Sequence, residues 1–162
     1  SYTIEAAKKT KHISQIIVST DDKEVSVIAE KLGAKCPFIR PPELSEEWVN
    51  LEIVQKYTLD KIEELGYLPD LIVHLEETYP FRPDGMIDGM INQLLDGGFD
   101  SVVAAKNEPS WLWQEDDNGL IIRIDTGDIP RNFKQKTFLG LQGLGYVTYP
   151  SLIRDQKNIG SK

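Results

Sequence analysis

The sequence predicts a three-layer α/β domain with a mostly parallel sheet and one β-rich insertion. Up to Lys106, short apolar segments alternate with segments whose apolar residues recur every three or four positions, as in strands joined by amphipathic helices. This alternation indicates right-handed β-α-β crossovers. After Lys106 it stops, and hairpin-like segments follow. The 162 residues fit a single domain, 1–162, with an insertion at 107–140.

The first part of the predicted domain holds three helices and two short strands. Residues 2–10 have the pattern of a helix end, and "ISQIIVS" at 13–19 is a short apolar strand. The helix predicted over 21–33 opens with acidic residues, has one apolar face and stops at a glycine. A strand around 36–39 precedes a proline-containing loop, and the apolar stripe over 48–65 predicts a long helix.

The next segments carry the predicted centre of the sheet and its insertion. "LIVHL" at 71–75 is apolar on both faces, as strands at the centre of parallel sheets are. A helix over 84–96 and a buried strand over 100–105 follow it. Two apolar runs around Asp-Asp-Asn-Gly predict a hairpin over 111–124. The glycine-interrupted segment 137–149 predicts a return to the sheet.

Composition and charge exclude several classes of function. The net charge of −8 and the pI near 4.8 argue against a broad nucleic-acid-binding surface, although a local basic pocket could still bind a small anion. No apolar stretch approaches the about 18 residues that a membrane span requires. Cys36 is the only cysteine, which excludes an internal disulfide framework and fits a reducing compartment, the cytoplasm.

Polar residues follow two of the predicted strands directly. The strand at 71–75 runs into Glu76 and Glu77, with Thr78 and Arg82 just beyond, and the strand at 13–19 runs into Asp21. In open α/β sheets, ligands bind beyond the carboxyl ends of the strands. Carboxylates there can accept sugar hydroxyls or hold a divalent cation, and a guanidinium suits a carboxylate or a phosphate. These strand ends therefore predict a ligand site.

Each of these side chains also has a structural reading. Asp21 and Asp22 can cap the following helix, Arg82 can form a solvated ion pair, and Glu77 can face water. His74 fits a core histidine, and neither histidine has a partner at metal-binding spacing. No glycine-rich phosphate loop or nucleophile elbow is present. Trp111 and Trp113 can clamp a ring, pack internally or contact a second subunit.

Several motifs together resemble the acylneuraminate cytidylyltransferases, which activate sialic-acid-like sugars as CMP-sugars. The similar segments are a strand ending Ser-Thr-Asp, "FIRPPEL", "LEETYPFRP", "DSVVAA" and "GLQGLGYVTYPSLI". The resemblance implies a Rossmann-like nucleotidyltransferase fold. It also implies attack by the anomeric hydroxyl of a nine-carbon 2-keto sugar acid on the α-phosphate of CTP, with pyrophosphate as the leaving group and Mg²⁺ as the cofactor.

The same resemblance assigns roles to individual residues. Glu76 and Thr78 would line the junction between the sugar and the α-phosphate, with Arg82 supporting their loop. The remaining candidates for substrate binding are Arg40 for the nucleotide, Arg131 for the sugar carboxylate, Tyr146 for the sugar pocket and, with capping as its alternative, Asp21.

The chain departs from the family's pattern in three ways. The family begins with a strand and a basic CTP-binding loop that would precede Ser1, and its Asp-x-Asp metal segment would follow Lys162. Glu77 stands where proline is usual, and Gln142 where asparagine is usual. We therefore expect a fragment whose metal ligands lie outside it and which alone binds CTP weakly. The sugar stays open, as do two rivals: another nucleotidyltransferase or glycosyltransferase, and a non-catalytic nucleotide-sugar-binding domain.

The insertion at 107–140 also predicts an assembly. An exposed segment with many large apolar residues usually marks an interface, and the resembling family forms dimers through a comparable arm. We therefore expect a two-fold homodimer. The apolar residues concerned are Trp111, Trp113, Ile121, Ile122, Phe133 and Phe138.

Overall fold

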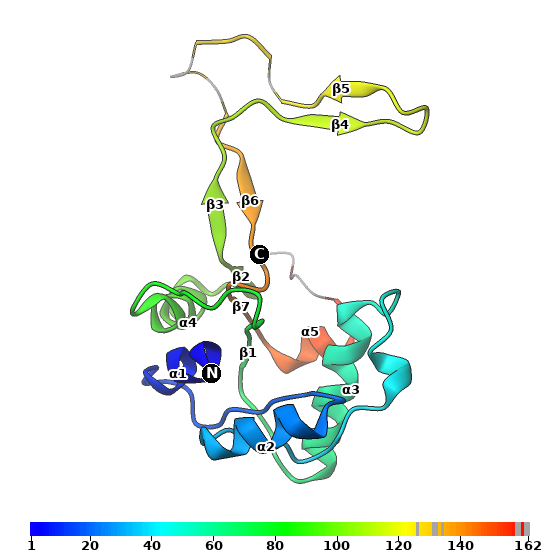
Figure 1. Ribbon diagram of the computed structural model, residues 1–162. Coiled ribbons are helices and arrows are strands. Elements are labelled where there is room, and N and C mark those ends of the chain that lie inside the picture. The colour runs from blue at the N-terminus through cyan, green and yellow to red at the C-terminus, as the bar shows by residue number, and fades with distance from the viewer. Residues whose placement is uncertain (126, 131–132, 134, 158–159, 161–162) are drawn as a thin grey trace. The chain divides into compact units, whose positions relative to one another are not determined.

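The computed structural model is a mixed α/β structure made of two compact units. It describes residues 1–125, 127–130, 133, 135–157 and 160. The first unit comprises Ser1–Ala104 and Gln142–Lys162, and the second comprises Ala105–Leu141 (Figure 1). The stretch predicted as an insertion lies within the second unit.

The helices of the first unit follow the apolar periodicity of the sequence. Asp22 caps the second helix, because its carboxylate accepts hydrogen bonds from the N–H groups of Glu24 and Val25 at 2.7 and 3.2 Å. Two glycines with left-handed backbone conformation, Gly85 and Gly98, flank the helix α4 (Met86–Gly97). The helices are α1 (Tyr2–Lys8), α2 (Lys23–Lys31), the 3₁₀ helix η1 (Pro42–Leu44), α3 (Leu51–Glu64), α4 (Met86–Gly97) and α5 (Pro150–Arg154).

The sheet of the first unit has the order β1-β7-β2. Both β1 (Ile72–His74) and β2 (Ser101–Val103) pair antiparallel with β7 (Tyr146–Thr148), and Val73, Val147 and Val102 lie in register. β1 and β2 therefore run in the same direction and are connected through α4. The predicted return to the sheet is β7, which enters between them.

The prediction of a mostly parallel sheet is not confirmed by the described strands. Every ladder among them is antiparallel. In the described chain, parallel pairing is seen in one isolated bridge, between Ile17 and Lys35, which lie outside the strands. β7 lies between the two parallel strands of the β1-α4-β2 unit, so each of them pairs with an antiparallel neighbour. This explains why the sheet is antiparallel although β1 and β2 run in the same direction. The strands expected at 13–19 and 36–39 are reduced to this bridge and its neighbouring hydrogen bonds.

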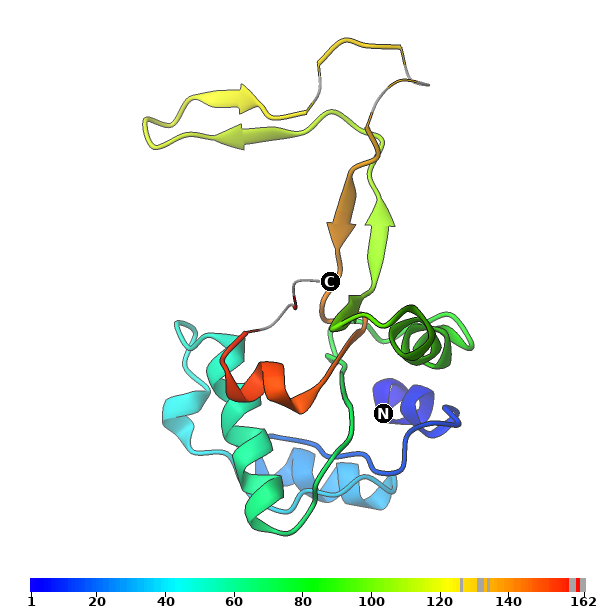
Figure 2. The same cartoon turned by 180° about the vertical axis from the view of Figure 1, so that it is seen from behind.

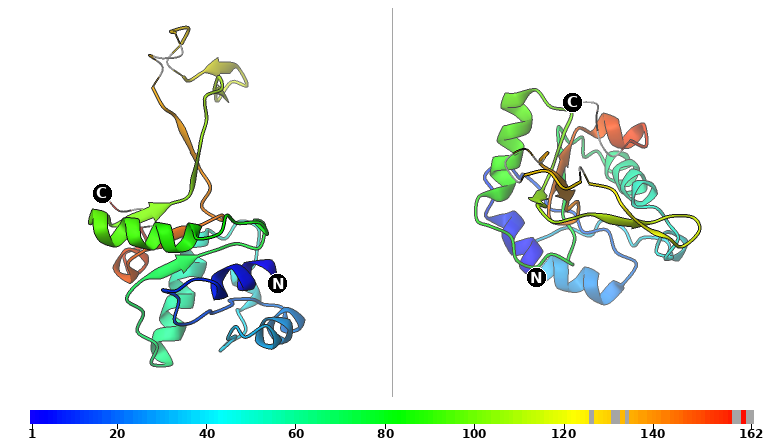
Figure 3. Two further views of the ribbon diagram at one scale, coloured as in Figure 1. Left: turned by 90° about the vertical axis from the view of Figure 1, so that its left-hand side faces the viewer. Right: turned by 90° about the horizontal axis from the view of Figure 1, so that it is seen from above.

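Three apolar clusters form the core of the first unit. In one of them α4 covers the sheet, with Ile91 and Leu94 packed against Val147 (Figure 3). In another α5 lies beside α3, where Ile153 packs against Leu59 (Figure 2). The third joins α1 to α2 and to the extended segment before α2 through Ile4, Ala29, Ala34, Ile16 and Val18.

The described strands of the second unit form two antiparallel pairs. β3 (Ala105–Asn107) pairs with β6 (Phe138–Gly140), and β4 (Trp113–Glu115) pairs with β5 (Ile121–Arg123). The second pair confirms the predicted hairpin, in which Asp116 accepts hydrogen bonds from Asn118 and Leu120 and Gly119 is left-handed. Across the described part of the chain, no helix has the length and apolar character of a membrane span.

Candidate functional site

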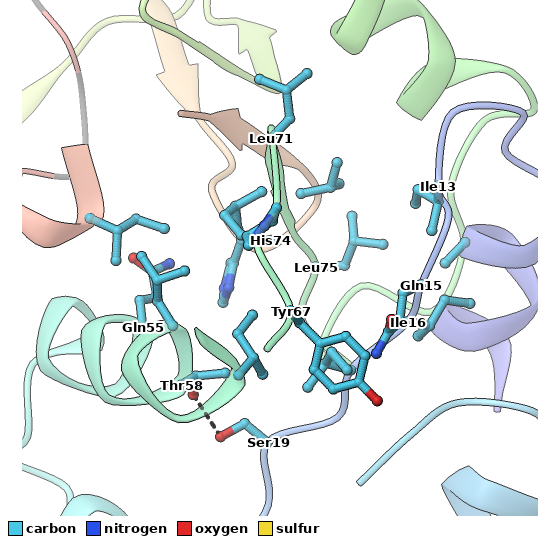
Figure 4. Close-up of a pocket in the computed structure, with 18 of the residues that line it drawn as sticks. Ile13, Gln15, Ile16, Ser19, Gln55, Thr58, Tyr67, Leu71, His74 and Leu75 are labelled. Carbon is cyan, nitrogen blue, oxygen red and sulfur yellow. Dashed lines mark hydrogen bonds between the residues drawn. The ribbon is translucent and has the colours of Figure 1, made fainter. Parts of the chain in front are cut away.

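A cavity of about 1000 Å³ lies within the first unit. The segments that line it are α1, residues 12–19, α3 and the strand β1 with its flanking residues (Figure 4). Its size is that of a small-molecule site. Most of its lining is aliphatic. Two groups of its polar residues concern the candidate site, one on α3 and the segment before α2, and the other at the end of β1.

The α3 side of the cavity carries a polar group that sequence reasoning missed. Gln55 is only 8% exposed, and neither polar atom of its amide has a hydrogen-bond partner among the described residues. Next to it on α3, the Thr58 hydroxyl donates to that of Ser19 at 2.9 Å (Figure 4). A buried amide without a partner is costly, so Gln55 is a candidate ligand contact. On a helix with an apolar stripe, only tertiary structure reveals its burial.

Arg40 and Asp21 meet beside this group. The Arg40 guanidinium donates to Asp21 at 3.4 Å, to the Ser19 carbonyl at 3.3 Å and to the Ser45 hydroxyl at 3.1 Å. These contacts use three of its five N–H donors, so two have no acceptor among the described residues and can bind a ligand. Asp21 is thus the ion-pair partner of Arg40, and the capping alternative applies to Asp22 instead.

The end of β1 brings together Glu76, Thr78 and His74. One carboxylate oxygen of Glu76 lies 3.4 Å from Nε2 of His74, and the other accepts from the Thr78 hydroxyl at 3.2 Å. Burial lowers the pKa of His74, and the Glu76 carboxylate only partly opposes this shift. His74 is therefore neutral at pH 7. The prediction of a core histidine did not include this contact with Glu76.

The loop before β7 closes around Glu76. The Glu76 N–H donates to the Gly143 carbonyl at 2.9 Å. A Cβ atom at Gly143 would lie 2.3 Å from a Glu76 carboxylate oxygen, so a larger residue there would force the Glu76 side chain to shift. Nearby, Nε2 of Gln142 is buried and has no hydrogen-bond partner in the described chain. Arg82 donates to the carbonyls of both Glu76 and Gly143, as a support of this loop would.

Among the predicted site residues, Arg40 and Glu76 line the cavity. Asp21, Thr78 and Arg82 each bond to one of these two residues but do not line the cavity. Tyr146 is fully buried in β7, where burial raises the pKa of its hydroxyl, and it does not line the cavity. Arg131 lies outside the described residues.

The side chains described in the structure do not by themselves fit a Mg²⁺ site. Among them there is no group of three or more His, Cys, Asp or Glu that could hold a metal ion. Asp21 is paired with Arg40, and Glu76 is held by His74 and Thr78.

A strand-end acidic residue, a basic residue with free donors and a cavity of this size suit a nucleotide-using transferase. Residues 1–130 match the family described as cytidylyltransferase. The chain therefore belongs to the cytidylyltransferase family, a family of nucleotidyltransferases, and the resemblance seen in its motifs is confirmed.

Three curated proteins are similar to this chain. The CMP-N,N'-diacetyllegionaminic acid synthase of Legionella pneumophila is 24% identical over 165 residues, which cover 100% of this chain and 71% of that protein. Two pseudaminic acid cytidylyltransferases of Campylobacter jejuni, from serotypes O:2 and O:23/36, are 30% and 29% identical over 80 residues. In both, the match covers 49% of this chain and 34% of the relative.

Proposed function

We propose that this protein activates a nine-carbon 2-keto sugar acid of the sialic-acid type with CTP, giving a CMP-sugar and pyrophosphate. The family match over residues 1–130 carries the proposal. The names of the relatives support the substrate class, because they act on legionaminic and pseudaminic acids, and these are sugar acids of this type. A soluble enzyme that uses CTP would work in the cytoplasm.

In the proposed reaction, the anomeric hydroxyl of the sugar attacks the α-phosphorus of CTP. A new oxygen–phosphorus bond forms, and the bond from the α-phosphorus to the pyrophosphate oxygen breaks. Glu76 would accept the hydrogen bond, and then the proton, of the attacking hydroxyl, and Thr78 would orient the same carboxylate. The two free N–H donors of Arg40 would bind the nucleotide.

The sugar would be recognised from the loop before β7. The unpartnered amide nitrogen of Gln142 lies in this loop, at the position where the resembling family usually has asparagine. It would donate to a sugar oxygen, and Arg131 would pair with the sugar carboxylate. We also propose a two-fold homodimer and a requirement for Mg²⁺ to offset the phosphate charge, with ligands for the ion from outside the described side chains.

We further propose a Rossmann-like arrangement for the complete sheet. The strands β1 and β2, which run in the same direction and are joined through α4, support it.

The decisive test is pyrophosphate release from CTP. Residues 1–162 and a protein extended at both ends are assayed with legionaminic, pseudaminic and N-acetylneuraminic acids, with and without Mg²⁺. We expect Mg²⁺-dependent CMP-sugar formation by the extended protein and weak CTP binding without turnover by residues 1–162. Thermal shifts with CTP, UTP, GTP and ATP serve as the control, since only the bound nucleotide raises the melting temperature.

Each other outcome contradicts a defined part of the proposal. Stabilisation by a different nucleotide would indicate another nucleotidyltransferase or a glycosyltransferase. A CTP-induced shift without turnover in either protein would indicate a non-catalytic nucleotide-binding domain.

A further inference from the structure

Arg82 has the most completely bonded side chain at the end of β1. Its Nε donates to the Leu144 carbonyl at 2.7 Å. Its Nη1 donates to the Tyr79 carbonyl at 2.6 Å and to the Thr3 hydroxyl at 3.1 Å. Its Nη2 donates to the carbonyls of Glu76 and Gly143 at 2.7 and 2.9 Å. A guanidinium has five N–H donors, and here each has a protein acceptor.

These five bonds join three segments that are distant in sequence. Glu76 and Tyr79 belong to the loop after β1, Gly143 and Leu144 to the loop before β7, and Thr3 to the first turn of α1. The Glu76 N–H also donates to the Gly143 carbonyl, so the two loops are linked directly and through the guanidinium. The position of the Glu76 carboxylate relative to Gly143 therefore depends on Arg82.

The charge of Arg82 is not offset by a bonded carboxylate. All five acceptors are neutral, and no ion pair of Arg82 occurs among the described residues. Burial lowers the pKa of the guanidinium, while the nearby Glu76 carboxylate opposes this shift. The group still carries its positive charge at pH 7, because arginine does not lose its proton in proteins. Arg82 thus has a fixed fork of bonds and a positive charge to which no described carboxylate is bonded.

We propose that Arg82 is a positioning residue that does not contact the substrate. Through its five hydrogen bonds it holds the loop after β1, which carries Glu76, in place against Gly143 and Leu144. With every donor used, it has none left for a ligand. The consequence for turnover rests on the proposed function, whereas the consequence for the loops does not.

The loop consequence is tested by hydrogen exchange on the folded protein. Arg82→Met removes all five bonds, and Arg82→Lys keeps the charge but offers at most three donors from a single nitrogen. We expect exchange of the Glu76 N–H to rise about tenfold or more in both variants, with that of the Val18 N–H, which bonds to Lys35 in another part of the unit, unchanged. Arg154→Met is the control, because Arg154 pairs with Glu63 on α3. Equal rises at Glu76 and Val18 would indicate general destabilisation and overturn the proposal.

The kinetic consequence is tested on the extended protein. We expect kcat/KM for the sugar to fall about 100-fold in Arg82→Met, with the CTP-induced thermal shift retained. Arg82→Lys should recover only a small part of this loss, since the charge alone does not restore the fork. Full recovery by lysine would show that charge acts alone and overturn the positioning role. If Arg82→Met does not fold, the test uses Arg82→Lys alone. Wild-type kinetics together with wild-type hydrogen exchange in the folded variant would refute the proposal. Absence of activity in the wild type would contradict the proposed function but leave the exchange result standing.

Discussion

At the scale of single residues, the site depends on one carboxylate whose surroundings come from separate segments. The sequence predicts Glu76 because an acidic residue closes an apolar strand. It does not predict the Gly143 backbone that packs against the carboxylate, since that contact forms only when β7 pairs with β1. Glu76 follows His74, the last residue of β1, by two positions, and in an extended segment this spacing places two side chains on the same side. This spacing is a local signal by which their contact could have been predicted.

Glu76→Gln tests the assignment of this carboxylate. The replacement is nearly isosteric, so we expect an unchanged circular dichroism spectrum and melting temperature. Turnover of the extended protein should fall about 100-fold or more, because the amide cannot accept a proton. Glu30→Gln, at an exposed position of α2, is the matched control and should retain full activity. Wild-type turnover in Glu76→Gln would show that the residue is structural.

At the scale of elements, local patterns predicted the helices better than the strands. Helices over 21–33, 48–65 and 84–96 were expected, and α2, α3 and α4 occupy Lys23–Lys31, Leu51–Glu64 and Met86–Gly97. The apolar runs of β1 and β2 were also recognised, and β7 was expected as a return to the sheet. The place of β7 between them and its antiparallel direction were not predicted, because pairing and direction are fixed by contacts between residues far apart in sequence. The hairpin of β4 and β5 was predictable because its turn residues are local.

The ordered structure beside the hairpin of β4 and β5 should depend on the carboxylate of Asp125. Asp125 accepts hydrogen bonds from the N–H groups of Gly127 and Leu112 at 2.9 and 3.1 Å, and from Arg123 at 2.7 Å. Burial alone raises the pKa of Asp125, but these bonds outweigh it and lower the pKa to about 2, from the usual 3.8. A lowered pKa means stabilisation that is complete above the unfolded value and lost as the pH falls through the folded value.

We therefore expect the Leu112 and Gly127 amides to lose protection as the pH falls from about 4 to about 2. NMR exchange measurements would follow both amides. In Asp125→Asn they should be less protected at pH 7, and their protection should no longer change within that window. Asp117→Asn, at an exposed turn position, is the control. Protection that stays constant to pH 2 in the wild type would contradict this account.

At the scale of the whole molecule, large apolar side chains are distributed unevenly between the two units. The core clusters lie in the first unit, whereas the second unit exposes large apolar residues on short strands and loops. Trp111 is 64% exposed and stacks on the Arg123 guanidinium, with 4.8 Å between its ring centroid and Cζ. Trp113 is 55% exposed. The alternative in which both tryptophans pack internally is therefore not supported for a single chain. The other exposed residues include Leu120, Ile121, Ile122, Ile124, Phe133, Phe138 and Leu139.

Exposed apolar side chains at this density favour an interface, and a second copy of the chain is the partner that we propose. We expect light scattering to give the mass of a dimer at tens of micromolar. Trp113→Glu should shift the protein to a monomer with little change in melting temperature, because the side chain is already exposed in one copy and its burial occurs only on association. Gln114→Glu, on the opposite face of β4, adds the same charge and should remain dimeric. A wild-type monomer at that concentration would contradict the homodimer, and a Trp113→Glu dimer would place its interface away from β4.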